Sequence, residues 1–187
     1  MGDVGEYYSV DELNDVVQSL ITPDFDSLEI TGGEPLLNSD YIRDFLSKYD
    51  YKAMLETNAT LPENLYDLVD VIDIVSMDIK LPEHFNSKKE WLTVYENELK
   101  SIKIMEDYNL KYYIKIVVSP TTSTQIIEDI LKDLNGLVSG NVEVIVQPVS
   151  PMSLWDTKEN LFTISELIGK HFSVSIIPQI HKYLEIE

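Results

Sequence analysis

The sequence predicts an α/β protein built from repeated βα units around a parallel sheet. Short β-rich apolar runs alternate with amphipathic stretches along the whole chain, at a spacing of about 25 to 35 residues. No Pro/Gly/Ser-rich linker divides this series, and 187 residues suit one ordinary domain. We therefore expect a single domain over residues 1–187, with either a partial, open barrel or a doubly wound sheet.

Six helices are predicted from apolar residues at helical spacing. Ser9 and Glu12 fit a capping box, which begins the first helix. Ser39 or Asp40 is expected to cap the second helix, and Pro62 suits the first position of the third. The six helices are expected at residues 10–21, 40–49, 62–69, 88–107, 124–136 and 158–170.

Six strands are predicted between these helices, from runs rich in Val, Ile, Tyr and Thr. They are expected at residues 27–31, 51–56, 72–79, 111–118, 142–147 and 172–177. The series opens with a helix, as if a preceding strand and its loop were missing.

Composition excludes several classes of partner. The 14 basic residues against 33 acidic ones give a net charge of −19, so no nucleic-acid-binding surface is expected. The apolar runs of about five to seven residues are far below the roughly 20 that span a bilayer, and no secretory signal is visible. We therefore expect a cytoplasmic protein without a membrane segment. The absence of cysteine excludes disulfides, thiolate nucleophiles and Cys-ligated metal or cluster sites from this sequence.

Polar residues follow the predicted strands, where parallel α/β folds bind their ligands. After the first strand, Gly32 and Gly33 allow another molecule to approach the backbone, and the Glu34 carboxylate suits an ammonium group. A turn with an acidic residue near a helix start explains the same residues without a ligand. Thr57 and Asn58 fit either a binding loop or a capped turn.

Later strand ends give weaker signals. Asp78 and Lys80 lie two residues apart, and therefore on one side, as a charged pair in a barrel mouth or at a solvated edge. Gln147 precedes a proline and suits a ligand contact or a turn equally. Residues 178–184 place several donors after the last strand. The three histidines lack the spacing of a metal site, so no metal ligand is assigned.

Together these segments resemble a known family. Residues 28–37, which include Gly32, Gly33 and Glu34, are similar to the Gly-Gly-Glu strand of the radical S-adenosylmethionine superfamily. Within it, the chain resembles the 7-carboxy-7-deazaguanine synthases and related organic radical activating enzymes at residues 56–58, 75–82, 147–148 and 179–184. The resemblance implies a partial (β/α)6 TIM-like barrel with parallel strands, here lacking the first strand and the cluster loop.

The resemblance also implies cofactors and a substrate. Members of the family hold S-adenosylmethionine and a 4Fe–4S cluster, and they contract a pterin-like small molecule, 6-carboxytetrahydropterin, on the route to queuosine or archaeosine. By this resemblance Gly32, Gly33 and Glu34 would take the amino group of S-adenosylmethionine. Its carboxylate and ribose would be lined by Thr57, Asn58, Ser76, Asp78 and Lys80. The adenine or the substrate would be faced by Gln147, Gln179, His181 and Lys182.

The sequence departs from this family at the cluster. The family binds the cluster through three cysteines after its first strand, and this chain has none. We therefore expect that this polypeptide does not cleave S-adenosylmethionine, and we interpret it as a core domain that lacks an upstream segment. The alternatives are an activase of a glycyl radical enzyme and a non-catalytic protein that binds S-adenosylmethionine or a nucleoside. A missing first strand would expose a sheet edge, through which we expect a homodimer.

Overall fold

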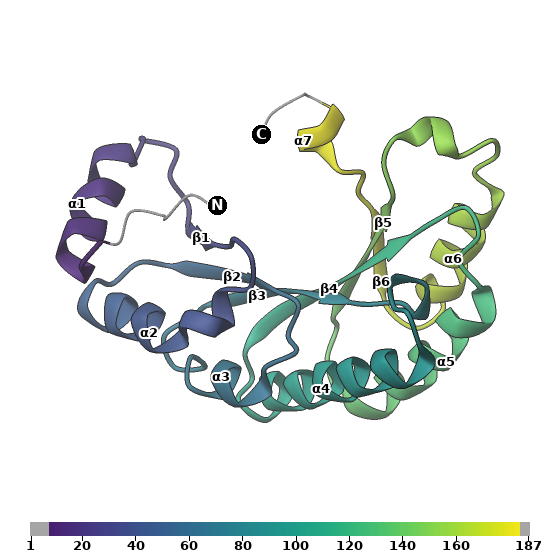
Figure 1. Cartoon of the computed structure of the whole chain (residues 1–187), viewed down its shortest axis with the longest axis horizontal. Coiled ribbons are helices and arrows are strands. Elements are labelled where there is room, and N and C mark those ends of the chain that lie inside the picture. Colours follow the sequence, from purple (N-terminus) through teal and green to yellow (C-terminus); the bar gives the residue numbers. More distant parts are fainter. Residues whose placement is uncertain (1–7, 184–187) are drawn as a thin grey trace.

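The computed structural model of the chain describes residues 8–183, without the side chains of His181 and Tyr183. One six-stranded sheet lies at its centre, in the strand order β1-β2-β3-β4-β5-β6. All neighbouring strands pair in parallel. Figure 1 shows that the sheet curves into an open arc, with helices along its convex side. The prediction of an open, barrel-like sheet with parallel strands is thereby confirmed.

Each predicted strand is present. The fourth has the predicted bounds, whereas the first is two residues shorter because the chain turns away after Ile30. The strands are β1 (Leu28–Ile30), β2 (Ala53–Thr57), β3 (Ile74–Ile79), β4 (Lys111–Val118), β5 (Glu143–Pro148) and β6 (Ser173–Ile176).

The predicted helices are also present, and the capping box of Ser9 and Glu12 forms. The second helix begins one residue earlier than expected, and Asn38 takes the cap position without a side-chain hydrogen bond. The helices are α1 (Val10–Leu20), α2 (Ser39–Lys48), α3 (Pro62–Tyr66), α4 (Lys88–Asp107), α5 (Thr124–Leu137), α6 (Glu159–Gly169) and α7 (Ile180–Tyr183). Short 3₁₀ turns lie at Pro35–Asn38, Pro82–His84 and Met152–Leu154.

The core lies between the convex face of the sheet and helices α2 to α6. On the inner strands β2 to β5 alternate residues point to this face, and they are buried and mostly apolar, as Val75, Met77 and Ile79 are on β3. Ile127, Ile130, Leu131 and Leu134 of α5 and Leu161, Ile164 and Ile168 of α6 are buried against it, as their spacing predicts.

Helix α1 is covered less than its sequence pattern predicts. Val17 is buried, but Leu20 is 72% exposed, and Val16 and Ile21 are exposed as well. Figure 1 places α1 at one end of the arc, beyond β1, where it has α2 as its helical neighbour. An apolar helix face at the end of a sheet has fewer elements to pack against than one over its middle.

Candidate functional site

The loop after β1 exposes backbone at the carboxyl-terminal rim of the sheet. Gly32 has a φ of +101° and Gly33 a φ of +25°, conformations in which L residues are strained. A Cβ atom added to either glycine would meet no heavy atom within 4 Å. The glycines are therefore required by backbone geometry, and the space beside them is open to another molecule.

Glu34 follows these glycines and is fixed by the neighbouring loop. Its carboxylate accepts hydrogen bonds from the backbone N–H groups of Leu36 (3.0 Å) and Asn58 (2.9 Å) and from Oγ1 of Thr57 (2.5 Å). A carboxylate has about four acceptor positions, so about one remains for a ligand. The structure thus brings Glu34, Thr57 and Asn58 together at the ends of β1 and β2, as the sequence-based site requires.

The concave face of the sheet carries charged side chains in place of apolar ones. Lys115 of β4 forms ion pairs with Glu56 of β2 and with Asp78 of β3, the latter at 3.3 Å. Lys80 binds the other oxygen of Asp78 at 2.8 Å, with both side chains partly buried. The barrel-mouth alternative for the Asp78 and Lys80 pair therefore describes its position better than a solvated edge.

The ion pair between Glu56 and Lys115 shifts the pKa of both side chains. Burial opposes ionisation of Glu56, but the hydrogen bond and charge of Lys115 outweigh it and lower the pKa of Glu56. Burial likewise disfavours the charged Lys115, yet Glu56 and Asp78 raise its pKa. On β1, burial and a hydrogen bond shared with Glu56 raise the pKa of Glu29. The concave face therefore presents both charged carboxylates and a cation to a ligand.

Two side-chain oxygens on the concave face have no hydrogen-bond partner among the described residues. They are Oγ of Ser76 and Oδ1 of Asp78, although Lys115 Nζ lies 3.3 Å from the latter as an ion pair. Ser76 is only 1% exposed, so it lies beneath the face rather than open at the rim. Buried polar atoms are normally partnered, so Oγ of Ser76 fits a position that a buried water would complete, whereas Oδ1 of Asp78 already faces the Lys115 cation.

A separate cleft lies at the ends of β5 and β6. It has a volume of about 700 Å³ and is lined by Pro148, Gln179 and Lys182 among others, including Leu161 and Ile176. Gln147 lies on the concave face of β5, whereas its neighbour Pro148 lies on the other face. The structure therefore does not bring Gln147 into this cleft. His181 lies on α7, and its side chain falls outside the described residues.

Sequence reasoning did not select Glu29, Glu56 and Lys115 as site residues. The signal was available, since Glu56 and Lys115 alternate with buried residues on their strands and Glu29 lies between two partly buried apolar residues. Pattern alone does not say which charged residues on neighbouring strands meet. The parallel register does, since it sets Asp78 opposite Lys115.

The described residues contain no group of three or more His, Cys, Asp or Glu side chains that could hold a metal ion. In the same part of the chain, no helix combines the length and the apolar character needed to cross a membrane.

Comparison with known sequences finds clear relatives, whereas no protein family model matches the chain. The chain is 34% identical to 7-carboxy-7-deazaguanine synthase of Methanothermobacter thermautotrophicus, over 96% of this chain and 78% of that protein. It is also 34% identical to the same enzyme of Methanocaldococcus jannaschii, over 94% and 73% respectively. A third relative, that of Geobacter sulfurreducens, is 29% identical over 85% and 63%.

Solved structures with the same fold are more distant in sequence. A domain of pyruvate-formate lyase-activating enzyme from Bacteroides vulgatus matches with a TM-score of 0.66 at 16% identity, over 82% of this chain and 99% of that one. Streptococcus suis SuiB, solved with bound S-adenosylmethionine, matches with a TM-score of 0.52 at 16% identity, over 85% and 41%. At these identities the likeness concerns the fold.

Proposed function

Because the chain belongs to the 7-carboxy-7-deazaguanine synthase family of radical S-adenosylmethionine proteins, we propose that it is the core domain of such an enzyme. Membership agrees with the resemblance found in the sequence. In this proposal the rim of the sheet binds S-adenosylmethionine and the concave face binds the small-molecule substrate. The observation that carries the proposal is the Glu34 carboxylate, which is fixed beside two glycines with open space above their backbone.

The residues at the rim fit the charged end of S-adenosylmethionine. An ammonium group needs oxygen acceptors, and the remaining acceptor position of Glu34 and the backbone carbonyls beside Gly32 and Gly33 supply them. Thr57 and Asn58 hold the carboxylate in place, so their role is to orient Glu34 as much as to contact the cofactor. In the family this cofactor supplies the radical chemistry together with a 4Fe–4S cluster.

The cleft at the ends of β5 and β6 suits the adenine end of the cofactor or part of the substrate. Its lining combines apolar side chains such as Ile176 and Met152 with the polar Gln179 and Lys182. Flat aromatic ligands bind in apolar clefts with a few polar groups that fix their orientation. The assignments of Gln147 and His181 remain proposals, and in this structure Gln147 would act from the concave face instead.

The concave face fits a substrate with both donors and acceptors. The N–H donors of a pterin-like ring can form hydrogen bonds to carboxylates such as Glu29 and Asp78. The acidic group of such a substrate can pair with Lys115 or Lys80. The ion pairs among Asp78, Lys80 and Lys115 hold these three side chains in place before a ligand arrives.

The 4Fe–4S cluster of the family does not fit the residues of this chain. Such clusters are held by cysteine thiolates, and the sequence contains no cysteine. No step of the reaction is therefore derived for this polypeptide, and we propose that it binds S-adenosylmethionine without cleaving it.

Calorimetric titration with S-adenosylmethionine tests the proposed function. The unaltered chain should bind, and Glu34→Gln should weaken binding by about tenfold or more, because an ammonium loses its charged acceptor. Glu63→Gln removes the same charge from an exposed position on α3 and should leave the affinity unchanged. Absence of binding by the unaltered chain, or equal binding by Glu34→Gln, would show the proposed site to be wrong.

We also propose, as the sequence led us to expect, that the edge of β1 supports a homodimer. Within the described residues β1 pairs with β2 on one side and with no strand on the other. Exposed strand edges pair readily with further strands. Light scattering over a range of concentrations tests this, and a monomer at the highest concentration would contradict it.

A further inference from the structure

Helix α4 reaches from the convex side to two loops of the proposed cofactor site. Oγ of Ser101 donates to the backbone oxygen of Ala59 at 2.7 Å, and Nδ2 of Asn97 donates to that of Thr60 at 3.2 Å. Ala59 has a φ of +53°, which is strained for a residue with a side chain. One face of α4 thus fixes the loop that follows Asn58 at the end of β2.

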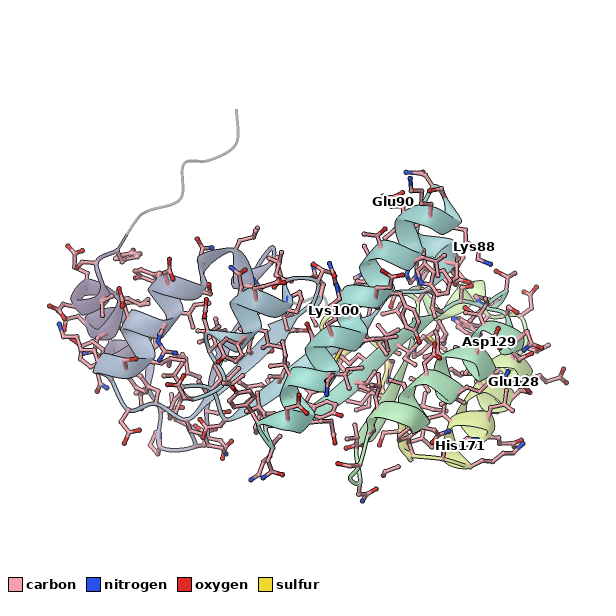
Figure 2. The ribbon with its side chains drawn as sticks, turned by 90° about the horizontal axis from the view of Figure 1, so that it is seen from below. Lys88, Glu90, Lys100, Glu128, Asp129 and His171 are labelled. Atoms are coloured by element: carbon pink, nitrogen blue, oxygen red, sulfur yellow. The ribbon has the colours of Figure 1, made fainter. Side chains whose placement is uncertain are left out.

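The same face of α4 holds the end of β3. Nε1 of Trp91 donates to the backbone oxygen of Lys80 at 2.8 Å, and the backbone N–H of Lys80 donates to Oε1 of Glu98 at 3.2 Å. Both the backbone C=O and the backbone N–H of Lys80 are therefore hydrogen-bonded to side chains of α4. Figure 2, seen from the helix side of the sheet, shows Glu90 and Lys100 on the outer surface of the same helix.

Glu98 is unusual among the carboxylates of the chain. Its side chain is completely buried, and its Oε2 has no hydrogen-bond partner within the described residues. Burying a carboxyl group is costly, and a helix that needed only core packing at this position would do better with an apolar residue. Within the described part of the chain, the hydrogen bond from the Lys80 N–H is the polar contact that the structure gives this side chain.

We propose that Glu98 is a positioning residue of the cofactor site, which fixes the backbone at Lys80 and thereby the Asp78 and Lys80 pair on the concave face. The inference rests on the proposed function, since it assigns Glu98 to the site that would bind S-adenosylmethionine. Glu98 acts through the backbone of Lys80 and touches neither cofactor nor substrate.

The charges around Glu98 agree with a neutral, hydrogen-bonded carboxyl group. Burial raises the pKa of Glu98 to about 8, against the opposing effects of the Lys80 N–H and the Lys80 charge, while Asp78 raises it further. On α4 itself the neighbouring titratable group is Tyr95, whose pKa is raised chiefly by burial. Glutamine should therefore replace Glu98 well, because it keeps an oxygen acceptor for the Lys80 N–H.

The test combines calorimetry with hydrogen exchange of the amides at Lys80 and Leu81. Glu98→Leu removes the acceptor, and we expect S-adenosylmethionine affinity to fall by about tenfold and exchange at Lys80 to speed up by a similar factor. Glu98→Gln should keep both near the values of the unaltered chain. Glu96→Gln, an exposed position on the same helix, is the matched control and should change neither.

The possible results separate this inference from the proposed function. Equal affinity and equal Lys80 exchange in Glu98→Leu and the unaltered chain would overturn the inference, even if Glu98→Leu lowers the melting temperature. If the unaltered chain does not bind S-adenosylmethionine, the proposed function fails, and the inference fails with it as a statement about that site. The exchange rates still decide then whether Glu98 fixes Lys80. If Glu98→Leu does not fold, Trp91→Phe removes the other contact to Lys80 and should lower affinity likewise.

Discussion

Replacement of Glu98 by glutamine is expected to make the protein more stable than the unaltered chain above neutral pH. In the folded protein burial raises the pKa of Glu98 to about 8, against an ordinary value of 4.5. Between these two values the folded state binds a proton that the unfolded state does not. Stability of the unaltered chain therefore falls as pH rises through this window, with the Glu98 contribution fully present only below the unfolded pKa.

The size of the effect follows from linkage. Each pH unit inside the window costs about 1.4 kcal/mol, so the stability of Glu98→Gln relative to the unaltered chain should grow by about 3 kcal/mol between roughly pH 5.5 and 7.5. Other groups titrate alike in both proteins, and their effects cancel in the difference. A typical domain has only about 5 to 15 kcal/mol of stability, so the change is easily measured.

Urea unfolding at a series of pH values gives the free energy of unfolding for each protein. Glu96→Gln, which removes an exposed carboxylate from the same helix, serves as the control and should follow the unaltered chain at every pH. A difference between Glu98→Gln and the unaltered chain that does not change with pH would mean that Glu98 keeps its charge when buried. The reasoning from burial would then be refuted.

Three further outcomes are expected. Gly32→Ala should destabilise the fold by about 1 to 2 kcal/mol in thermal unfolding. The cause is backbone strain at the positive φ, since the added Cβ has room, and an unchanged melting temperature would contradict this. Lys115→Met leaves Glu56 and Asp78 without their shared cation and should lower the free energy of unfolding by about 3 kcal/mol. The double variant Lys115→Met with Glu56→Gln should regain part of this stability. If the double variant is as unstable as the single one, repulsion between the carboxylates is not the cause. Incubation of the chain with S-adenosylmethionine and dithionite should yield no 5′-deoxyadenosine by chromatography, because no cysteine is present to hold a cluster; its formation would refute that expectation.

Much of the fold follows from the sequence because its elements obey simple periodicities. The 20 residues of α4 and the eight of β4 have the predicted bounds, since a long helical pattern and a β-rich run leave little choice. The short α7 and the 3₁₀ turns were missed, because a single turn contains too few residues to show a period.

The candidate site was predictable only in part. Gly32, Gly33 and Glu34 follow a strand directly, so local sequence places them at the rim. The link from Glu34 to Thr57 spans 23 residues, and that from Lys80 to Glu98 spans 18, and neither spacing has a local rule. Glu98 in particular looks like any polar residue of an amphipathic helix until the packing of α4 is known.

The succession of neighbours in the sheet has a consequence for biosynthesis. Each strand from β2 to β6 pairs with the strand made just before it, so no part of the sheet has to wait for a distant stretch of polypeptide. A nascent chain leaving the ribosome can add one βα unit at a time to a growing edge, and each addition closes a short loop at low entropic cost. Pulse proteolysis of ribosome-bound chains of increasing length should therefore show protection advancing stepwise from the amino-terminal units.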